Sequence, residues 1–280
     1  MPRIAIYRTE EGGAKLFQQQ LELLTHLYNV DVQLVTANDI LEDALDKETI
    51  GLVVPGRSRG QYYRDELGEK GFQRIQSATR NGMSVLAVCA GSYILSREAV
   101  WDNSLNSADR KKASCPFPLF DGATIGPMAR FWQDGYQASG GSQNDQATIL
   151  SANIVNVRFD GIEGEAHALY WGGGNFEPST RQTARTLASH SDETPAVIEF
   201  EYGKGQVIFS NIHPEITSLA FRDVFQHTAK ALRNRTGFTR DQHRLAAAED
   251  RRQMIFHQFL YNCGLEVPKT LLFPALTPSY

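Results

Sequence analysis

The sequence predicts an α/β fold in which an open, mostly parallel sheet carries helices on both faces. Through the first hundred residues, short apolar segments rich in β-branched residues alternate with segments of helical periodicity. Ile50–Val54 is continuously apolar and stops at Pro55-Gly56, as a buried central strand that ends in a turn should. Met83–Val88 is a second buried strand of this kind, and it leads into a helical pattern without a spacer.

The elements of the first half follow from these patterns in order. The expected strands are Arg3–Tyr7, Val30–Val35, Ile50–Val54 and Met83–Val88. A helix over 14–28 has leucines at helical spacing after a Gly-Gly pair, and a second helix over 64–81 separates the third strand from the fourth. From residue 101 to about 151 the chain is rich in Ser, Asn, Asp, Gly and Pro. We expect this segment to be an irregular excursion that carries only short strands.

Regular patterns return in the second half of the chain. The expected strands are Ile154–Phe159, Ala168–Trp171, Ala196–Tyr202 and Gln206–Ser210. Helices are expected over 217–233 and 240–263, and the latter stops at Gly264. The tail from Pro268 to Tyr280 is punctuated by proline and should lie on the surface without regular structure. We therefore expect one domain over residues 1–237, with a C-terminal helix and tail over 238–280 packed against it.

Composition and charge exclude several classes of function. The 280 residues carry a formal net charge of -4, and the basic residues are interpreted as spread along the chain rather than clustered. Nucleic acid is therefore not an expected partner. The first residues lead directly into a strand-like run, and no apolar stretch is long enough to span a bilayer. We expect a cytoplasmic protein without membrane partners.

The cysteines and histidines do not form a metal-binding pattern. Three cysteines, Cys89, Cys115 and Cys263, are too few and too scattered for a disulfide framework or a CxxC site. The histidines outside the run discussed below show no ligand spacing with cysteine or acid. We expect no metal and no cofactor, and at least one free thiol.

Cys89 stands where a buried strand turns directly into a helix. A nucleophile in this position is held above the edge of the sheet with a helix N-terminus aimed at it, which stabilises a thiolate. Such a turn requires small neighbours, and Ala87, Ala90 and Gly91 meet this requirement. The competing interpretation is a buried, inert cysteine after a strand, which is common in α/β proteins.

A second candidate group lies far downstream, at His213-Pro214-Glu215. A histidine just beyond a late strand, with an acid two residues later, can reach the end of a neighbouring strand while the acid orients the imidazole. The competing interpretation is a surface histidine before a Pro-Glu helix start. Together with Cys89, the run predicts a Cys-His-Glu triad.

These residues resemble the class I glutamine amidotransferase superfamily, whose flavodoxin-like domain carries a Cys on an elbow and a His-x-Glu after a later strand. More narrowly, almost the whole chain resembles the biotin-protein ligase N-terminal-like family. The narrower resemblance is carried by the runs at 53–56, 89–93, 119–127, 170–176, 213–215 and 263–267.

The resemblance implies roles for individual residues. Cys89 would attack a carbonyl, His213 would transfer the proton, and Glu215 would orient His213. Backbone amides of Gly56 or Arg57 and of Ala90 would hold the oxyanion. Arg57 stands where relatives usually carry the second glycine of a pair, so it departs from the family pattern and could instead place a guanidinium near a bound anion.

Two further glycines, Gly173 and Gly174, follow a strand in a Gly-Gly-Gly run. They would either let the backbone approach a ligand closely or form a flexible turn. The sequence leaves both interpretations open, and we include the pair among the candidate substrate-binding residues.

The leading hypothesis is a cysteine-dependent amide hydrolase or amidotransferase-like protein acting on a small-molecule amide or acyl substrate, with a protein partner where ammonia has to be passed on. A non-catalytic binding or regulatory module that retains the fold is the main alternative, and a redox-sensing thiol is a third. The Gly56–Gly60 run looks superficially like the adenylate loop of biotin ligases. No other signature of a ligase domain is found in the sequence, so biotinylation by this chain alone is not expected.

Overall fold

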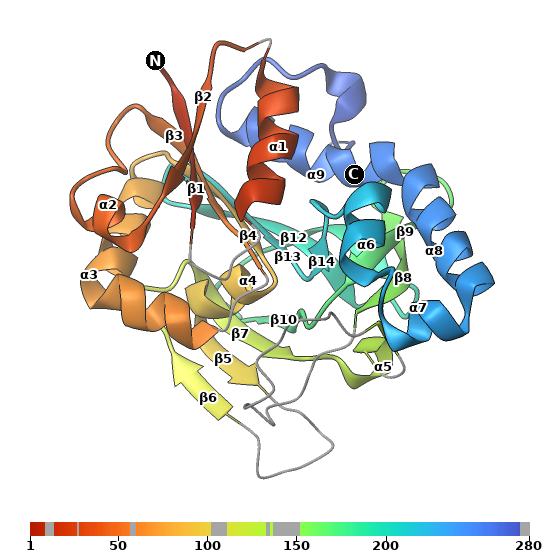
Figure 1. The fold of residues 1–280 in the computed structure, drawn as a ribbon. Coiled ribbons are helices and arrows are strands. Elements are labelled where there is room, and N and C mark those ends of the chain that lie inside the picture. The colour runs from red at the N-terminus through yellow and green to blue at the C-terminus, as the bar shows by residue number, and fades with distance from the viewer. Residues whose placement is uncertain are drawn as a thin grey trace, which may run out of the picture.

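A computed structural model of the chain describes residues 1–8, 14–26, 28–56, 60–101, 111–132, 135–136 and 152–274. Within these ranges, ten strands form one sheet that crosses the molecule, and four more strands form a smaller sheet beneath it (Figure 1). Helices lie on both faces of the large sheet (Figure 1). The predicted α/β class, with helices on both faces of an open sheet, is confirmed.

The large sheet has a parallel half and an antiparallel half. The parallel half consists, in spatial order, of β2 (Asp31–Val35), β1 (Arg3–Tyr7), β3 (Thr49–Val54), β4 (Ser84–Val88) and β13 (Gly205–Ser210). It continues as the antiparallel strands β12 (Pro195–Tyr202), β11 (Arg185–His190), β8 (Asn153–Phe159), β9 (Glu165–Tyr170) and β14 (Ile212–His213). Short turns join several of these later strands, and a turn of that length permits only antiparallel pairing.

Alternating side chains divide the interior into a core on each face of the parallel half. In β1, Ile4 and Ile6 point to one core, whereas Ala5 and Tyr7 point to the other. The helices α1 (Ala14–Thr25) and α9 (Glu249–Asn262) cover the first face. The second face is covered by α2 (Ala37–Leu41), α3 (Gly60–Arg80) and α4 (Ala90–Leu95). The inner strands β1, β3, β4 and β13 are therefore buried on both faces, which explains their apolar runs, whereas the edge strand β2 is partly exposed.

The smaller sheet is formed by β10 (Asn175–Pro178), β7 (Phe120–Gly126), β5 (Ser96–Trp101) and β6 (Lys111–Ser114). Only β6 and β7 lie within the excursion expected from residue 101 to about 151. Phe120 joins this sheet to the large one. Its ring lies 6.4 Å from the ring of Phe176, 5.4 Å from that of Phe200 and 5.5 Å from that of Phe209, centroid to centroid. This aromatic cluster seals the contact between the two sheets. The short helix α5 (Ala129–Trp132) follows β7.

Both helices expected near the C-terminus are divided in two. The first consists of α6 (Ser218–Phe225) and α7 (Ala229–Arg233), because the Thr228 side chain accepts a hydrogen bond from the Ala231 amide and starts a new helix. The second consists of α8 (Arg235–Ala247) and α9, which meet at the buried Ala248. The break turns the apolar side of α9 onto the sheet.

The structure differs from the sequence prediction in some short elements and in the placement of the C-terminal tail. The strands β10 and β11 and the helix α2 were not predicted, since they are short and carry no clear period. The tail is not wholly on the surface, because the ring of Phe273 is buried and stacks on Phe159 at 5.8 Å, and a 3-10 turn spans Lys269–Leu271. Among the described helices, none combines the length and apolar character needed to cross a bilayer.

The aromatic cluster gives a stability prediction. Phe120→Ala should lower the free energy of unfolding by about 3–5 kcal/mol, because it leaves a cavity between the two sheets. Urea unfolding followed by circular dichroism measures this change. Tyr261→Ala, at a ring that is 52% exposed, is the matched control and should alter stability by about 0.5 kcal/mol or less. Equal losses in the two variants would contradict a sealing role for Phe120.

Candidate active site

Cys89 occupies a strained backbone conformation at the end of β4. Its φ is 50° and its ψ is -109°, a region that side-chain-bearing residues rarely adopt. The amide of Cys89 donates to the carbonyl of Ser210 in the adjacent β13 at 2.8 Å, and its carbonyl accepts from the amides of Ser92 and Tyr93 in α4. These bonds fix the strand-to-helix elbow that the sequence predicts at this position.

The elbow is packed too tightly to accept larger neighbours. A Cβ atom added to Gly91 would lie 2.2 Å from the carbonyl oxygen of Val54, so only glycine fits between α4 and β3. Gly56 is equally constrained. A Cβ atom there would lie 2.8 Å from Cys89 Cβ and 2.8 Å from His213 Cε1. The backbone of Gly56 therefore lies against both residues of the predicted nucleophile-base pair.

His213 and Glu215 form a buried pair beside Cys89. Pairing of β14 with β9 sets His213 opposite Leu169. Its Nδ1–H donates to Glu215 Oε1 at 2.7 Å, and both side chains are almost completely buried. Within the described part of the chain, His213 Nε2 and Glu215 Oε2 have no partner in hydrogen-bond geometry. The imidazole is thus oriented through one nitrogen and has the other one available.

The surroundings of His213 favour its charged form. Burial acts to lower the pKa, but the Glu215 carboxylate and the neighbouring Cys89 outweigh it and raise the pKa of His213 to about 10. An imidazole with this pKa is protonated at neutral pH. A protonated imidazole beside a thiol stabilises the thiolate, which is the reactive form of cysteine.

The thiol of Cys89 is directed toward the segment that follows β9. Its Sγ–H donates to the carbonyl of Trp171 at 3.3 Å. The next three carbonyls, those of residues 172–174, accept hydrogen bonds from Tyr93 Oη, Tyr170 Oη and Asn211 Nδ2. Side chains therefore form hydrogen bonds to the carbonyls of four successive residues, 171–174, and hold this segment in place beside the thiol.

Gly173 and Gly174 belong to this segment beside the Cys89 thiol. A Cβ atom on Gly173 would be 2.2 Å from the Asn211 carbonyl oxygen, and one on Gly174 would be 2.6 Å from Thr124 Cγ2. Both glycines are thus packed against protein atoms, whereas the sequence left open either a flexible turn or contact with a ligand. A role for them in substrate binding stays a prediction.

The remaining predicted residues are placed as follows. Ala90 is the first residue of α4 and follows the nucleophile directly. Arg57 lies outside the described residues. Burial raises the pKa of Cys115 to about 11 and raises that of Cys263 well above its ordinary value. Both thiols are therefore poor nucleophiles at neutral pH.

Sequence reasoning missed the contributions of Trp171 and Asn211. Besides its carbonyl bond to Cys89, Trp171 places its indole 6.1 Å from the His213 imidazole, ring centroid to ring centroid. Asn211 donates to two carbonyls, and its Oδ1 is 3.0 Å from His190 Nε2. The one signal in the sequence was where these residues lie: Trp171 follows a strand, and Asn211 precedes the His-Pro-Glu run.

Across the described ranges, no group of three or more His, Cys, Asp or Glu side chains is arranged to hold a metal ion.

The charged imidazole predicts an unusual pH profile for Cys89. An ordinary thiol, with a pKa of about 8.5, is about 0.3% ionised at pH 6. Because protonated His213 stabilises the thiolate, iodoacetamide should alkylate Cys89 at pH 6 faster than it alkylates Cys115 and Cys263. His213→Ala should reduce the rate at pH 6 at least about tenfold. Peptide mass spectrometry resolves the three cysteines, with Cys115 and Cys263 as internal references.

The exposed His227→Ala is the control and should keep the parent profile. A parent Cys89 that reacts only above pH 8 would contradict the assignment of an activated thiol.

Gly56 gives an independent prediction. Gly56→Ala should push the Cys89 and His213 side chains apart and abolish fast alkylation of Cys89 at pH 6, because the added methyl group would lie 2.8 Å from both. Gly60→Ala is the matched control, since the nearest atom to its added methyl group is 3.4 Å away. Alkylation rates and melting temperatures should be measured together. An unaltered rate in a folded Gly56→Ala protein would show that the two side chains do not act together.

Comparisons with known proteins are consistent with this architecture. A family model described as "Biotin-protein ligase, N terminal" matches residues 4–280. The biotin–protein ligase of Schizosaccharomyces pombe is 25% identical over 217 residues, which make up 73% of this chain and 31% of that ligase. The chain thus corresponds to about a third of the length of the ligase.

The solved structures that align with this chain share little sequence identity with it and have TM-scores below 0.5. A glutamine amido transferase from Methylobacillus flagellatus aligns over 90% of this chain and 94% of its own, with 12% identity and a TM-score of 0.45. A putative ThuA-like protein from Bacteroides uniformis aligns over 75% of this chain and 81% of its own, with 12% identity and a TM-score of 0.43. Because the family model matches nearly every residue, the chain belongs to the biotin-protein ligase N-terminal family.

Proposed function

We propose that Cys89, His213 and Glu215 are the nucleophile, the base and the orienting acid of a cysteine-dependent amide hydrolase or amidotransferase. The observation that carries the proposal is the meeting of a strained elbow cysteine with a buried imidazole whose pKa is raised to about 10. A buried histidine that only filled space would be neutral, and its pKa would be lowered, as burial does at His190.

The proposed reaction has two stages. The Cys89 thiolate attacks the amide carbonyl carbon, a C–S bond forms, and the carbonyl electron pair moves to the oxygen. Collapse of this intermediate breaks the C–N bond, and the leaving amine takes the Nε2 proton of His213. Water then attacks the thioester carbonyl while His213 Nε2 accepts its proton, and collapse breaks the C–S bond, which releases the acid and restores the Cys89 thiolate beside protonated His213. Glu215 accepts the Nδ1–H bond throughout.

Two backbone amides are the proposed oxyanion donors. One belongs to Ala90, directly after the nucleophile, and the other belongs to Gly56 or to Arg57 beyond it. Gly56 lies against both Cys89 and His213, as the steric contacts of its missing side chain indicate. Donors fixed by the backbone need no reorganisation as charge develops on the oxygen.

Activation transfers the thiol proton of Cys89, which the Trp171 carbonyl accepts at 3.3 Å, to His213 Nε2. Cys89 already lies close enough to His213 for their interaction to raise the pKa of the imidazole.

The substrate class follows from the chemistry of the triad and from the resemblance to glutamine amidotransferases. We infer a small primary amide, with glutamine as the first compound to test. Ammonia released by such a reaction would pass to a separate protein or to another domain. The activity of the S. pombe ligase belongs to that protein, and location in the cytoplasm stays a prediction.

The alternative is a binding module without turnover. The 7% exposure of Cys89 and its bond to a carbonyl favour this alternative, because both describe a thiol at rest in a closed site. It differs from the enzyme hypothesis in one measurable respect, since a binding module forms no covalent intermediate.

The proposed function is tested by covalent trapping and turnover. A diazoketone analogue of glutamine should add to Cys89 alone, as detected by intact and peptide mass spectrometry, and ammonia release should be measured over a panel of primary amides. Cys89→Ala should abolish both signals. Glu215→Gln should retain the fold and reduce turnover by about 10²–10⁴-fold, because the imidazole loses its anionic partner.

Cys115→Ala, at a buried thiol with a raised pKa, is the matched control and should leave both signals unchanged. Fast alkylation of Cys89 without adduct or turnover across the panel would leave the triad chemically active but would exclude small primary amides as its substrates.

A further inference from the structure

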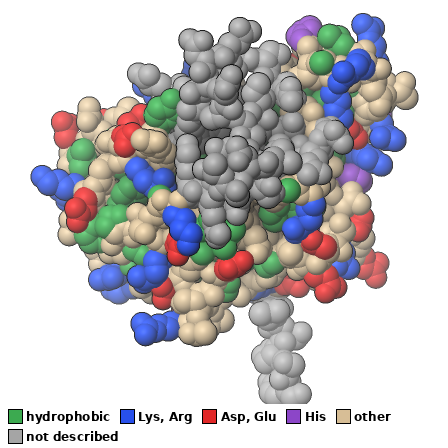
Figure 2. Space-filling view, turned by 90° about the horizontal axis from the view of Figure 1, so that it is seen from below, with side chains coloured by type: hydrophobic (Ala, Val, Ile, Leu, Met, Phe, Trp, Pro, Cys, Tyr) green, Lys and Arg blue, Asp and Glu red, His purple; other side chains and the backbone are tan. Residues whose placement is uncertain are grey.

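The helices α7 and α8 carry a local excess of positive charge. Residues 229–247 contain five Lys and Arg residues and one Asp, a formal charge of +4 in a chain whose net charge is -4. The even spread of basic residues expected from the sequence is therefore wrong for this segment. Figure 2 shows Lys and Arg side chains on the side of the molecule where Figure 1 places α7 and α8, and others on the opposite side.

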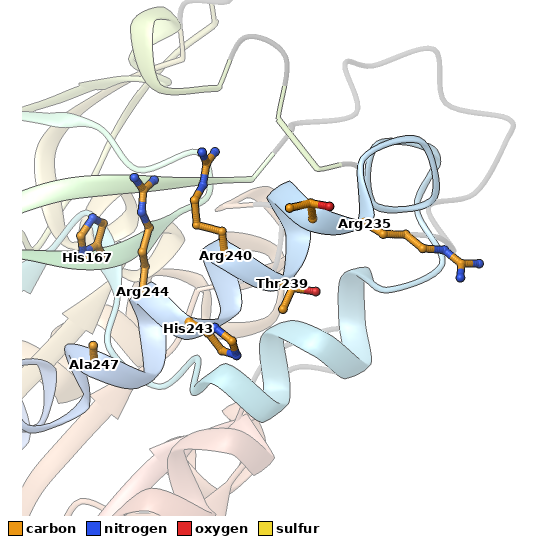
Figure 3. Close-up of a pocket in the computed structure, with 8 residues that line it drawn as sticks. His167, Arg235, Thr239, Arg240, His243, Arg244 and Ala247 are labelled. Atoms are coloured by element: carbon orange, nitrogen blue, oxygen red, sulfur yellow. The ribbon is translucent and has the colours of Figure 1, made fainter.

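A groove of about 690 Å³ lies along α8, with His167 of β9 on its other side. Arg240 and Arg244 project in the same direction from successive turns of α8, and His167 lies beside Arg244 (Figure 3). Thr239 also lines the groove, and Ala247 supplies an apolar end. The groove is open to solvent along much of its length, so a ligand held there would stay partly exposed.

The positive charge of the groove is only weakly compensated. Asp241 lies 3.5 Å from Arg244 and 3.9 Å from Arg240, and its other oxygen accepts a hydrogen bond from Tyr136 Oη at 2.8 Å. One carboxylate is thus shared among two guanidinium groups and a phenol. Like charges four residues apart on a helix repel one another, and one carboxylate offsets this repulsion only in part. Local features that oppose stability are expected at functional sites.

The two walls of the groove are held rigidly. The opposite side of α8 places Phe238 and Leu245 in a buried cluster with Phe221 and Phe225. The guanidinium of Arg252 is fully buried, and its Nη1 donates to the carbonyls of Leu245 in α8 and His167 in β9. A buried cation therefore joins the helix to the strand, and the groove is preorganised.

We propose that the groove between α8 and β9 binds a small phosphorylated organic molecule, with its phosphoryl oxygens held by the guanidinium groups of Arg240 and Arg244. Planar guanidinium forks on successive turns can each give two parallel hydrogen bonds to one tetrahedral anion. His167 can donate one ring N–H to a third oxygen. Beyond the two guanidinium groups, Thr239 and Ala247 line the groove and would contact an organic moiety attached to the phosphate.

The ionisation of His167 supports this assignment. Burial lowers its pKa, and Arg244 and Arg252 add to the effect, against the opposing charges of Glu165 and Asp241. A phosphate dianion between His167 and Arg244 would reverse the balance and favour the charged imidazole. Ligand binding should therefore raise the pKa of His167.

Binding should be measured by calorimetry with the whole chain at low and moderate salt. Inorganic phosphate, ribose 5-phosphate and AMP test the phosphoryl group and the organic moiety, and adenosine is the phosphate-free probe. The phosphorylated organic probes should bind at least tenfold more tightly than inorganic phosphate, and adenosine should not bind. Tighter binding of AMP than of ribose 5-phosphate would identify a nucleotide, whereas equal binding would identify a sugar phosphate; either outcome supports the proposal.

Substitutions inside and outside the groove distinguish a specific binding site from general electrostatic attraction to basic residues. Arg240→Gln combined with Arg244→Gln should weaken binding of the best probe at least thirtyfold. Arg233→Gln, at an exposed arginine of α7 that does not line the groove, should change it less than twofold. NMR titration of the His167 ring, with and without the probe, gives a second measurement on the unaltered protein.

Two results would overturn the proposal. One is the absence of binding by every phosphorylated probe at 10 mM together with an unshifted His167 titration. The other is an equal loss in the groove and control variants, which would indicate adventitious attraction to a basic surface. Because neither outcome depends on Cys89, failure here leaves the proposed hydrolase function untouched.

Discussion

The parallel pairing of β4 with β13 is the contact on which the site depends. The pairing places Cys89 beside Ser210, and the hydrogen bond between the Cys89 amide and the Ser210 carbonyl holds the elbow closed. Since His213 follows only three residues after Ser210, the same register brings the imidazole to the thiol. A slip of one residue would turn alternate side chains of β13 to the wrong core and would also remove the base from the nucleophile.

Electrostatics and packing act together around this contact. The imidazole and Glu215 are withdrawn from water, and such a pair is stable only when every charge has a nearby counter-charge. Under the proposed function, a Cys89 thiolate would supply one of these partners. Gly56 and Gly91 leave no room for side chains, so the separation of the charges is set by backbone atoms. The geometry of the site is therefore fixed by the sheet and does not rely on mobile side chains.

The sequence predicted those parts that depend on local pattern. The apolar runs of β3 and β4 located the sheet, and the junction after Val88 located Cys89, because a buried strand and a following helix leave a clear signature. The division of the last helix at Ala248 was not predictable, since packing of Phe256 and Phe259 on the sheet decides it. The Trp171 carbonyl could not be found either, because every residue has a carbonyl and only the fold brings this one to the thiol. The groove on α8 was missed because charge was surveyed over the whole chain and not by segment.

The separation of Cys89 from its partners has a consequence for biosynthesis. His213 is made 124 residues after Cys89, and Glu215 two residues later still. While the ribosome extends the chain through that interval, the cysteine has neither its imidazole nor the β13 strand that shapes its elbow. Under the proposed function, the thiol of a nascent chain would therefore have ordinary chemistry. Its activation would follow only when the last strands join the sheet, so a reactive Cys89 would report the completion of folding.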